Sequence, residues 1–294
     1  MSGAFELAGM RQLPKEEPAQ KEKWYKGKPI VAAVVLMLIL WGCLCCNLIM
    51  TKDPVYMDLA NCNVPPCKEF LFGTDTMGRD IFSMIWYGGR ISLVIGIAAA
   101  FISTAVAIIF GAVSGSAPKW MDGLMMRLTD ILISIPGLLA VVLIQAVLGR
   151  ADILGLSFVI GITSWTAIAK VVRTETRRLR GSDYVTASKC MGGSFFHVLF
   201  HHLAPNFISS IMFMVVMNIR SAMIAEATLS FMGIGLPVGV ISWGSMLSLA
   251  EQALLTNAWW TIVIPGVFLI VTLLCMTSIG NYMRKNANRR HSNL

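Results

Sequence analysis

Long apolar stretches decide the fold class of this sequence. The chain has 294 residues, of which 56% are hydrophobic, and its mean hydropathy is +0.69. The apolar residues fall into six windows, at residues 30–50, 89–114, 124–148, 153–172, 207–232 and 259–281. A hydrocarbon core about 30 Å thick requires roughly 20 such residues per helix. The sequence therefore predicts an all-α integral membrane protein with six transmembrane helices.

The windows also give the order of segments along the chain. The first 29 residues are polar and lack a short apolar core followed by a small-residue cleavage site, so we expect a retained tail rather than a removable signal peptide. The predicted order is a basic tail at 1–29, a first transmembrane helix at 30–50, an extracytoplasmic segment at 51–88, a core with five further transmembrane helices at 89–282 and a second basic tail at 283–294.

The positive charges indicate the sidedness of the chain. It carries 24 Lys and Arg against 16 Asp and Glu, a net charge of +8, which is also typical of nucleic-acid-binding proteins. Here the basic residues cluster in alternate connections, as expected when cytoplasmic loops retain positive charge. This pattern indicates that the chain lies in a lipid bilayer and has no nucleic-acid partner. It predicts cytoplasmic termini and a cytoplasmic loop at 173–206, with 51–88, 149–152 and 236–258 outside.

The cysteines leave two alternatives open in the outer segment. Cys62 and Cys67 lie in "CNVPPC", where an oxidising compartment would allow a disulfide and the two prolines favour a turn. We weigh a Cys62–Cys67 disulfide equally against two free thiols. The remaining cysteines are expected to be small apolar packing residues.

The segment "DYVTASKCMGGSFFHVLFHHLAPN" (183–206) interrupts the apolar windows with an amphipathic helical pattern. Its expected apolar stripe consists of Tyr184, Ala187, Met191, Phe195, Leu199 and Leu203. Gly192 and Gly193 favour a turn in the middle, so we predict two short helices at an angle. Pro205 then ends the segment or starts the next span. The result would be a polar knuckle on the cytoplasmic face, tied at both ends to membrane helices.

This segment resembles the coupling loop of ATP-binding-cassette (ABC) importer permeases. The family pattern is Glu-Ala-Ala, three residues, Gly, nine residues, then a hydrophobic residue, any residue, Leu and Pro. Thr186, Ala187 and Ser188 stand at the triplet, Gly192 at the glycine and Pro205 at the proline, with Thr186 replacing the family's acid. The resemblance implies docking into a partner ATPase by Tyr184, Thr186, Ala187, Ser188, Gly192 and Pro205.

Four further stretches narrow the resemblance to one subfamily. "FGTDTMGRDIFSMIWYGGRISL" (72–93), "MRLTDILISIPGLL" (126–139), "AEATLSFMGIG" (225–235) and "SWGSML" (242–247) resemble the second, C-type permeases of dipeptide, oligopeptide and nickel importers. The resemblance implies the type I ABC importer permease fold in a bacterial or archaeal cytoplasmic membrane. It also implies four partners, namely a homologous second permease, two cytoplasmic ATPase subunits that hold ATP and Mg²⁺, and an extracytoplasmic substrate-binding protein.

The same resemblance predicts that this subunit is not an enzyme and holds no cofactor. The sequence contains no GxxxxGK[ST] phosphate loop, so energy must come from other subunits. Short peptides are the expected cargo, and nickel or a metal chelate is the alternative within the same importer class. An ion-coupled secondary transporter and an intramembrane enzyme are more distant alternatives, because neither inverted repeats nor a nucleophile-and-base set is evident. His197, His201 and His202 raise a metal alternative, but no acid or cysteine completes a set, so no metal site is predicted.

Three residues are candidates for the translocation path or its gate. Arg220 and Glu226 lie in the fifth window, and a charge exposed to lipid costs roughly 3 kcal/mol or more. Arg220 is expected to line the path or to pair across the permease dimer, and Glu226 to brace the gate. The alternative for both is an ion pair with another span that serves only packing. Trp243 in "SWGSML" is expected to help close the path from outside, with an interfacial aromatic anchor as the alternative.

The outer segment offers a candidate contact for the binding protein. Asp75, Arg79 and Asp80 in "GTDTMGRD" are predicted on an amphipathic helix that follows the first span. The alternative is that Thr74 or Asp75 caps that helix.

Overall fold

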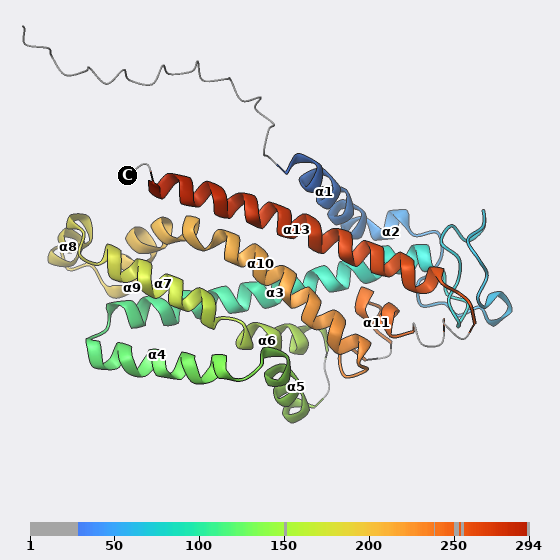
Figure 1. Cartoon of the computed structure of the whole chain (residues 1–294), viewed down its shortest axis with the longest axis horizontal. Coiled ribbons are helices and arrows are strands. Elements are labelled where there is room, and N and C mark those ends of the chain that lie inside the picture. The colour runs from blue at the N-terminus through green and yellow to red at the C-terminus, as the bar shows by residue number, and fades with distance from the viewer. Residues whose placement is uncertain (1–28, 150–151, 238, 250–252, 254–255, 293–294) are drawn as a thin grey trace, which may run out of the picture.

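The computed structural model describes residues 29–149, 152–237, 239–249, 253 and 256–292, and the predicted all-helical class is confirmed there (Figure 1). The only β-type pairing in this part of the chain is an isolated β-bridge between Thr74 and Asp80. The helices are α1 (Ile30–Leu44), α2 (Cys46–Ile49), η1 (Leu59–Asn61), α3 (Ile81–Ser116), α4 (Lys119–Ser134), α5 (Gly137–Leu148), α6 (Ile153–Thr163), α7 (Thr166–Leu179), α8 (Asp183–Cys190), α9 (Phe195–Val198), the π-helical turn η2 (Leu199–Leu203), α10 (Ala204–Phe231), α11 (Trp243–Ser248) and α13 (Trp260–Ser292). The predicted tail at 1–29 lies almost wholly outside the described residues.

The described helices provide between three and five candidate membrane spans. Three are long and apolar enough alone: α3, the continuous unit Phe195–Phe231 and α13. Two more arise if each bent pair, α4 with α5 and α6 with α7, counts as one span. The first predicted window contains α1, which has 15 residues and is separated from α2 at Cys45. A helix of 15 residues is shorter than the roughly 20 needed for a full crossing.

A proline causes the sharpest break, which the hydropathy windows did not predict. α4 and α5 meet at 90°. Pro136 precedes α5, and Ile135 before it is extended, with ψ of 125°. A residue before proline is driven out of the helical region, and proline has no N–H to donate. The window at 124–148 is therefore two helices rather than one.

Helix α3 lies at the centre of the packing. It runs alongside α7, α6 and α10 (Figure 1). Glycines bring the backbones close: a Cβ on Gly111 would lie 2.6 Å from the carbonyl oxygen of Ala169, and one on Gly161 would lie 2.9 Å from that of Ala99. Small residues of this kind allow helices to approach in a membrane, where lipid is as apolar as their side chains.

The bundle has two distinct ends (Figure 1). The short helices α8 and α9 lie at the same end as the C-terminal part of α13, and the segment 51–80 lies at the opposite end with α11. The charge distribution predicted this grouping. Helix α3 begins at Ile81, so the last eight residues of the predicted outer segment, 81–88, are helical.

Candidate functional site

The knuckle at 183–206 forms as two short helices, as the sequence predicted. The chain turns at Gly192, whose φ of +86° is accessible to glycine and strained for other residues. A Cβ on Gly193 would lie 2.8 Å from the Ser188 carbonyl oxygen, so the turn also requires the second glycine. Ser194 then caps α9 by accepting a hydrogen bond from the N–H of His197. Together these residues set the angle between α8 and α9.

Apolar side chains anchor the knuckle to the membrane helices. Val185 of α8, Val198 of α9 and Leu199 of η2 are buried. They belong to one cluster with Val172 of α7 and Phe207 of α10. The knuckle is therefore packed directly against α7 and α10.

The predicted apolar stripe is wrong in its first half. Tyr184, Ala187 and Met191 are exposed, and Met191 is 83% accessible. In the second half Phe195 is 38% exposed, whereas Leu199 and Leu203 are buried as predicted. The reason is that the helix bends at Gly192, so residues beyond the turn do not continue the same face. The exposed half leaves a surface for another molecule.

The other residues of the coupling pattern divide between surface and core. Thr186 is exposed and its hydroxyl donates to the carbonyl of Ser182, which stabilises the first turn of α8. Ser188 is buried at 4% exposure. Pro205 lies in the first turn of α10, inside the continuous helical unit Phe195–Phe231, so it neither ends the knuckle nor starts a separate span.

The histidines of the knuckle interact with aromatic rings rather than forming a metal set. The rings of His197 and His201 stack with centroids 4.4 Å apart, and His202 lies 6.0 Å from Tyr184. Within the described ranges no group of three or more His, Cys, Asp or Glu side chains is placed to hold a metal ion.

An ion-pair cluster that the sequence analysis missed lies close to the knuckle. Asp122 at the start of α4 is 3% exposed and accepts hydrogen bonds from Ser114 of α3 and from Arg173 and Arg177 of α7. The Arg177 bond is 2.6 Å long. A buried carboxylate with two guanidinium partners joins α3, α4 and α7 at the base of the knuckle. The only sequence signal was a single acid within a basic connection.

Glu226 is the centre of a second polar cluster, at the other end of α10. Its side chain is fully buried and accepts hydrogen bonds from three serine hydroxyls: Ser92 at 3.0 Å, Ser230 at 2.9 Å and Ser242 at 2.7 Å. The Ser92 hydroxyl accepts in turn from the backbone N–H of Trp243. The structure thus brings together two predicted gate residues, Glu226 and Trp243, through Ser92.

Trp243 is buried within the chain rather than placed as a surface anchor. Its side chain has no exposure, and its indole N–H donates to the Ile85 carbonyl at 2.9 Å. Two glycines make room for α11: a Cβ on Gly89 would lie 2.5 Å from the Trp243 ring, and one on Gly244 would lie 2.5 Å from Ala227. α11 is therefore fixed tightly against α3 and α10.

Arg220 is not part of this cluster, although it lies on the same helix. It precedes Glu226 by six residues, which is about 9 Å along the axis and on a different face. Its side chain is half-buried, and its Nε is buried with no hydrogen-bond partner among the described residues. Such a group is expected to find a partner outside its own chain or in water.

The predicted helix at "GTDTMGRD" is wrong, because these residues form a loop that caps α3. Asp75 and Arg79 form an ion pair at 2.7 Å, and both are buried. Asp80 is the N-cap of α3 and accepts from the N–H and the hydroxyl of Ser83. These side chains stabilise the outer loop, and the helix is capped by Asp80 rather than by Thr74 or Asp75 as the alternative expected. Contact of the three with a binding protein stays a prediction.

Cys62 and Cys67 are free thiols in this structure. The Cys62 thiol donates to the Leu59 carbonyl, and the Cys67 sulfur accepts from the N–H of Phe70. Each sulfur therefore stabilises its own turn.

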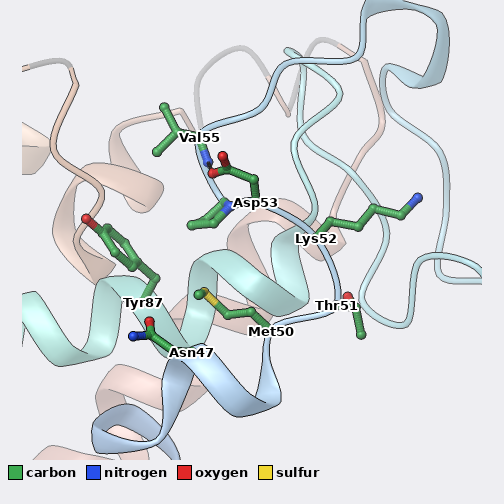
Figure 2. Close-up of a pocket in the computed structure, with 8 residues that line it drawn as sticks. Asn47, Met50, Thr51, Lys52, Asp53, Val55 and Tyr87 are labelled. Carbon is green, nitrogen blue, oxygen red and sulfur yellow. Dashed lines mark hydrogen bonds between the residues drawn. The ribbon is translucent and has the colours of Figure 1, made fainter.

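A pocket of about 480 Å³ lies between α2 and the start of α3 (Figure 2). Its polar groups come from Asn47, Asp53 and Tyr87, whereas Lys52 extends away from the Tyr87 ring. Lys52 instead pairs with Glu69 at 3.2 Å. None of the predicted site residues lines this pocket.

Comparison with known proteins identifies the family of this chain. Residues 107–290, which include the knuckle, Glu226 and Trp243, match the family of binding-protein-dependent transport system inner membrane components. The chain belongs to this family. It is 34% identical over 255 residues to the oligopeptide transport system permease protein OppC of Bacillus subtilis (strain 168), covering 87% of this chain and 83% of that protein. It is 32% identical over 258 residues to the dipeptide transport system permease protein DppC of the same organism, covering 87% and 80%.

The family resemblance drawn from the motifs is therefore confirmed. The chain is an inner-membrane permease component of an ABC importer, a transport subunit that does not itself carry out catalysis. Membership in a binding-protein-dependent system implies a substrate-binding protein and an ATPase as partners.

Proposed function

We propose that this chain imports di- and oligopeptides as one of two homologous permease subunits. In this complex two cytoplasmic ATPase subunits hold ATP and Mg²⁺, and an extracytoplasmic binding protein delivers the peptide. The proposal is supported by the relatives named for oligopeptide and dipeptide transport, which cover most of the chain. The alternative cargo within the same class is nickel or a metal chelate.

The observation that carries the coupling role is the exposed surface of the knuckle. Tyr184, Met191 and Phe196 are exposed on one side of a segment whose other side is buried against α7 and α10. Exposed aromatic side chains and methionine are typical of protein contacts. We assign this surface to an ATPase subunit, with Thr186, Ala187 and the Gly192 turn in the contact and Ser188 and Pro205 as its internal support. Movement of the ATPase would then tilt α7 and α10 and open the path alternately to each side.

The same proposal gives roles to the remaining candidates. The chain crosses the membrane six times, with α1 and α2 forming the first crossing and both termini in the cytoplasm. Glu226 and Trp243 brace α11 at the outer gate, Arg220 lines the path or pairs with the second permease, and the loop with Asp75, Arg79 and Asp80 receives the binding protein.

Reconstitution tests the cargo. The chain, its partner permease, the ATPases and the binding protein are placed in proteoliposomes, and uptake and ATP hydrolysis are measured with tri-alanine and with nickel or its chelates. We expect peptide to stimulate both activities. Stimulation by nickel species and by no peptide would overturn the peptide assignment while leaving the importer assignment intact.

A further inference from the structure

Two ion-pair contacts join α4 to α7, and they differ in burial. The Asp122 side chain is 4% exposed, and those of its partners Arg173 and Arg177 are 22% and 35% exposed. The second contact, between Asp130 Oδ1 and Lys170 Nζ at 2.7 Å, leaves the Asp130 side chain 64% exposed and that of Lys170 40% exposed. The position of this pair in the bundle indicates what its exposed charges face.

The exposed pair lies in segments predicted to cross the membrane, Asp130 in the window 124–148 and Lys170 in the window 153–172. Asp130 follows Asp122 by eight residues, about 12 Å further along α4. Lys170 adjoins Ala169, which contacts Gly111 in the apolar part of α3.

A pair of exposed charges in such segments is not expected to face lipid, since each charge there costs roughly 3 kcal/mol or more. The rest of α7 indicates where the pair faces. Ile168, Ala169 and Val172 are buried against α3, whereas Ala167 and Thr174, which share the side of Lys170, are exposed. Small and polar residues on that side are typical of a water-filled path.

We infer that Asp130 and Lys170 line the translocation path and bind the charges of the peptide in transit. Lys170 meets carboxylates of the cargo and Asp130 meets its ammonium groups. In the empty path the two side chains satisfy each other, and a peptide supplies a replacement charge for each. This inference rests on the proposed peptide import and adds to it a pair of residues that discriminate between cargoes.

The test compares the uptake of Ala-Glu-Ala with that of Ala-Lys-Ala by the reconstituted complex, at saturating peptide and binding protein. Lys170→Met removes the cation from the path, so the turnover ratio of the acidic to the basic peptide should fall about fivefold, the effect of one exposed ion pair. Asp130→Asn should raise the same ratio about fivefold, for the opposite reason. Lys170→Arg keeps the charge and should keep the ratio of the native complex.

The outer-loop pair Lys52–Glu69 provides a matched control, because its side chains are 37% and 72% exposed. Lys52→Met and Glu69→Gln should leave the ratio unchanged. Equal slowing of both peptides by the Asp130 and Lys170 variants, or loss of complex assembly, would overturn the inference and assign the pair to helix packing or to the contact with the second permease. If the native complex takes up neither peptide, the proposed function itself fails, which separates the two results.

Discussion

At the scale of single residues, Glu226 is the group whose surroundings are most specific. Its carboxyl group is fully buried, and its partners are three hydroxyls rather than a cation. Buried polar groups of this kind are retained where every donor and acceptor is satisfied. Ser92, Ser230 and Ser242 come from α3, from α10 and from the residue before α11, so one side chain fixes the relation of three elements.

Replacing Glu226 tests this role. Glu226→Ala leaves three buried hydroxyls without their acceptor, and each unsatisfied group costs roughly 1–3 kcal/mol. The purified complex should therefore unfold at a clearly lower temperature, as measured by thermal denaturation in detergent. Glu226→Gln keeps one oxygen acceptor, so its unfolding temperature should lie between those of the native complex and of Glu226→Ala. Glu69→Ala, at a carboxylate that is 72% exposed, is the control and should match the native protein. An unchanged transition in Glu226→Ala would show that α11 is held by Trp243 packing alone.

The sequence could identify Glu226 and Trp243 as unusual but could not join them. The hydroxyl that links them belongs to Ser92, 134 residues before Glu226, and no local pattern marks a serine as a partner for a distant acid. The buried Asp122 was missed for the same reason, since its arginines lie 51 and 55 residues away. Hydrogen-bond partners of this kind depend on tertiary packing.

At the scale of elements, the knuckle connects a surface to the membrane helices. Its exposed residues are on α8 and α9, and its buried residues pack against α7 and α10. The angle between the two short helices depends on Gly192, because its φ of +86° is the unusual backbone conformation at the turn. A change at this position alters the direction of the knuckle without removing any packing contact.

A β-branched residue at Gly192 tests the coupling role. A Cβ there would meet nothing within 4 Å, so the cost of Gly192→Val comes from its φ and is about 1–2 kcal/mol. The complex should assemble, but ATP hydrolysis should lose its dependence on substrate and uptake should fall several-fold. Gly181→Val is the matched control, since it also lies in open space before α8 but has no positive φ. If both variants couple hydrolysis to uptake normally, the turn has no role in coupling.

Periodicity and hydropathy predicted the helices well where local chemistry decides the outcome. The glycine pair predicted the break between α8 and α9, and the apolar windows found α3, α10 and α13. The windows could not show the 90° bend at Pro136, because hydropathy is insensitive to the backbone restriction that proline imposes. The helix predicted in the outer loop is wrong for a different reason. Asp75 and Arg79 are spaced as on one face of a helix, yet their ion pair closes a turn.

At the scale of the whole molecule, the bundle separates two functional ends. The knuckle and the end of α13 lie together, and the outer loop lies at the other end with α11 (Figure 1). The α3 helix, with 36 residues, connects the two ends in one element and contacts both the Asp122 cluster and the Glu226 cluster through Ser114 and Ser92. The two ends are therefore joined by a continuous helix, as the proposed alternating access would require.

Thiol labelling tests which end faces the cytoplasm. We expect the outer loop outside and the end of α13 inside, because basic residues are retained in the cytoplasm. In cells, a membrane-impermeant maleimide should label a variant that keeps only Cys67, which is exposed, and should not label a cysteine-free variant with Lys285→Cys, which is also exposed. Both should be labelled after the membrane is permeabilised, which controls for thiol reactivity. Labelling of Lys285→Cys in intact cells, with protection of Cys67, would reverse the orientation and remove α8 and α9 from reach of a cytoplasmic ATPase.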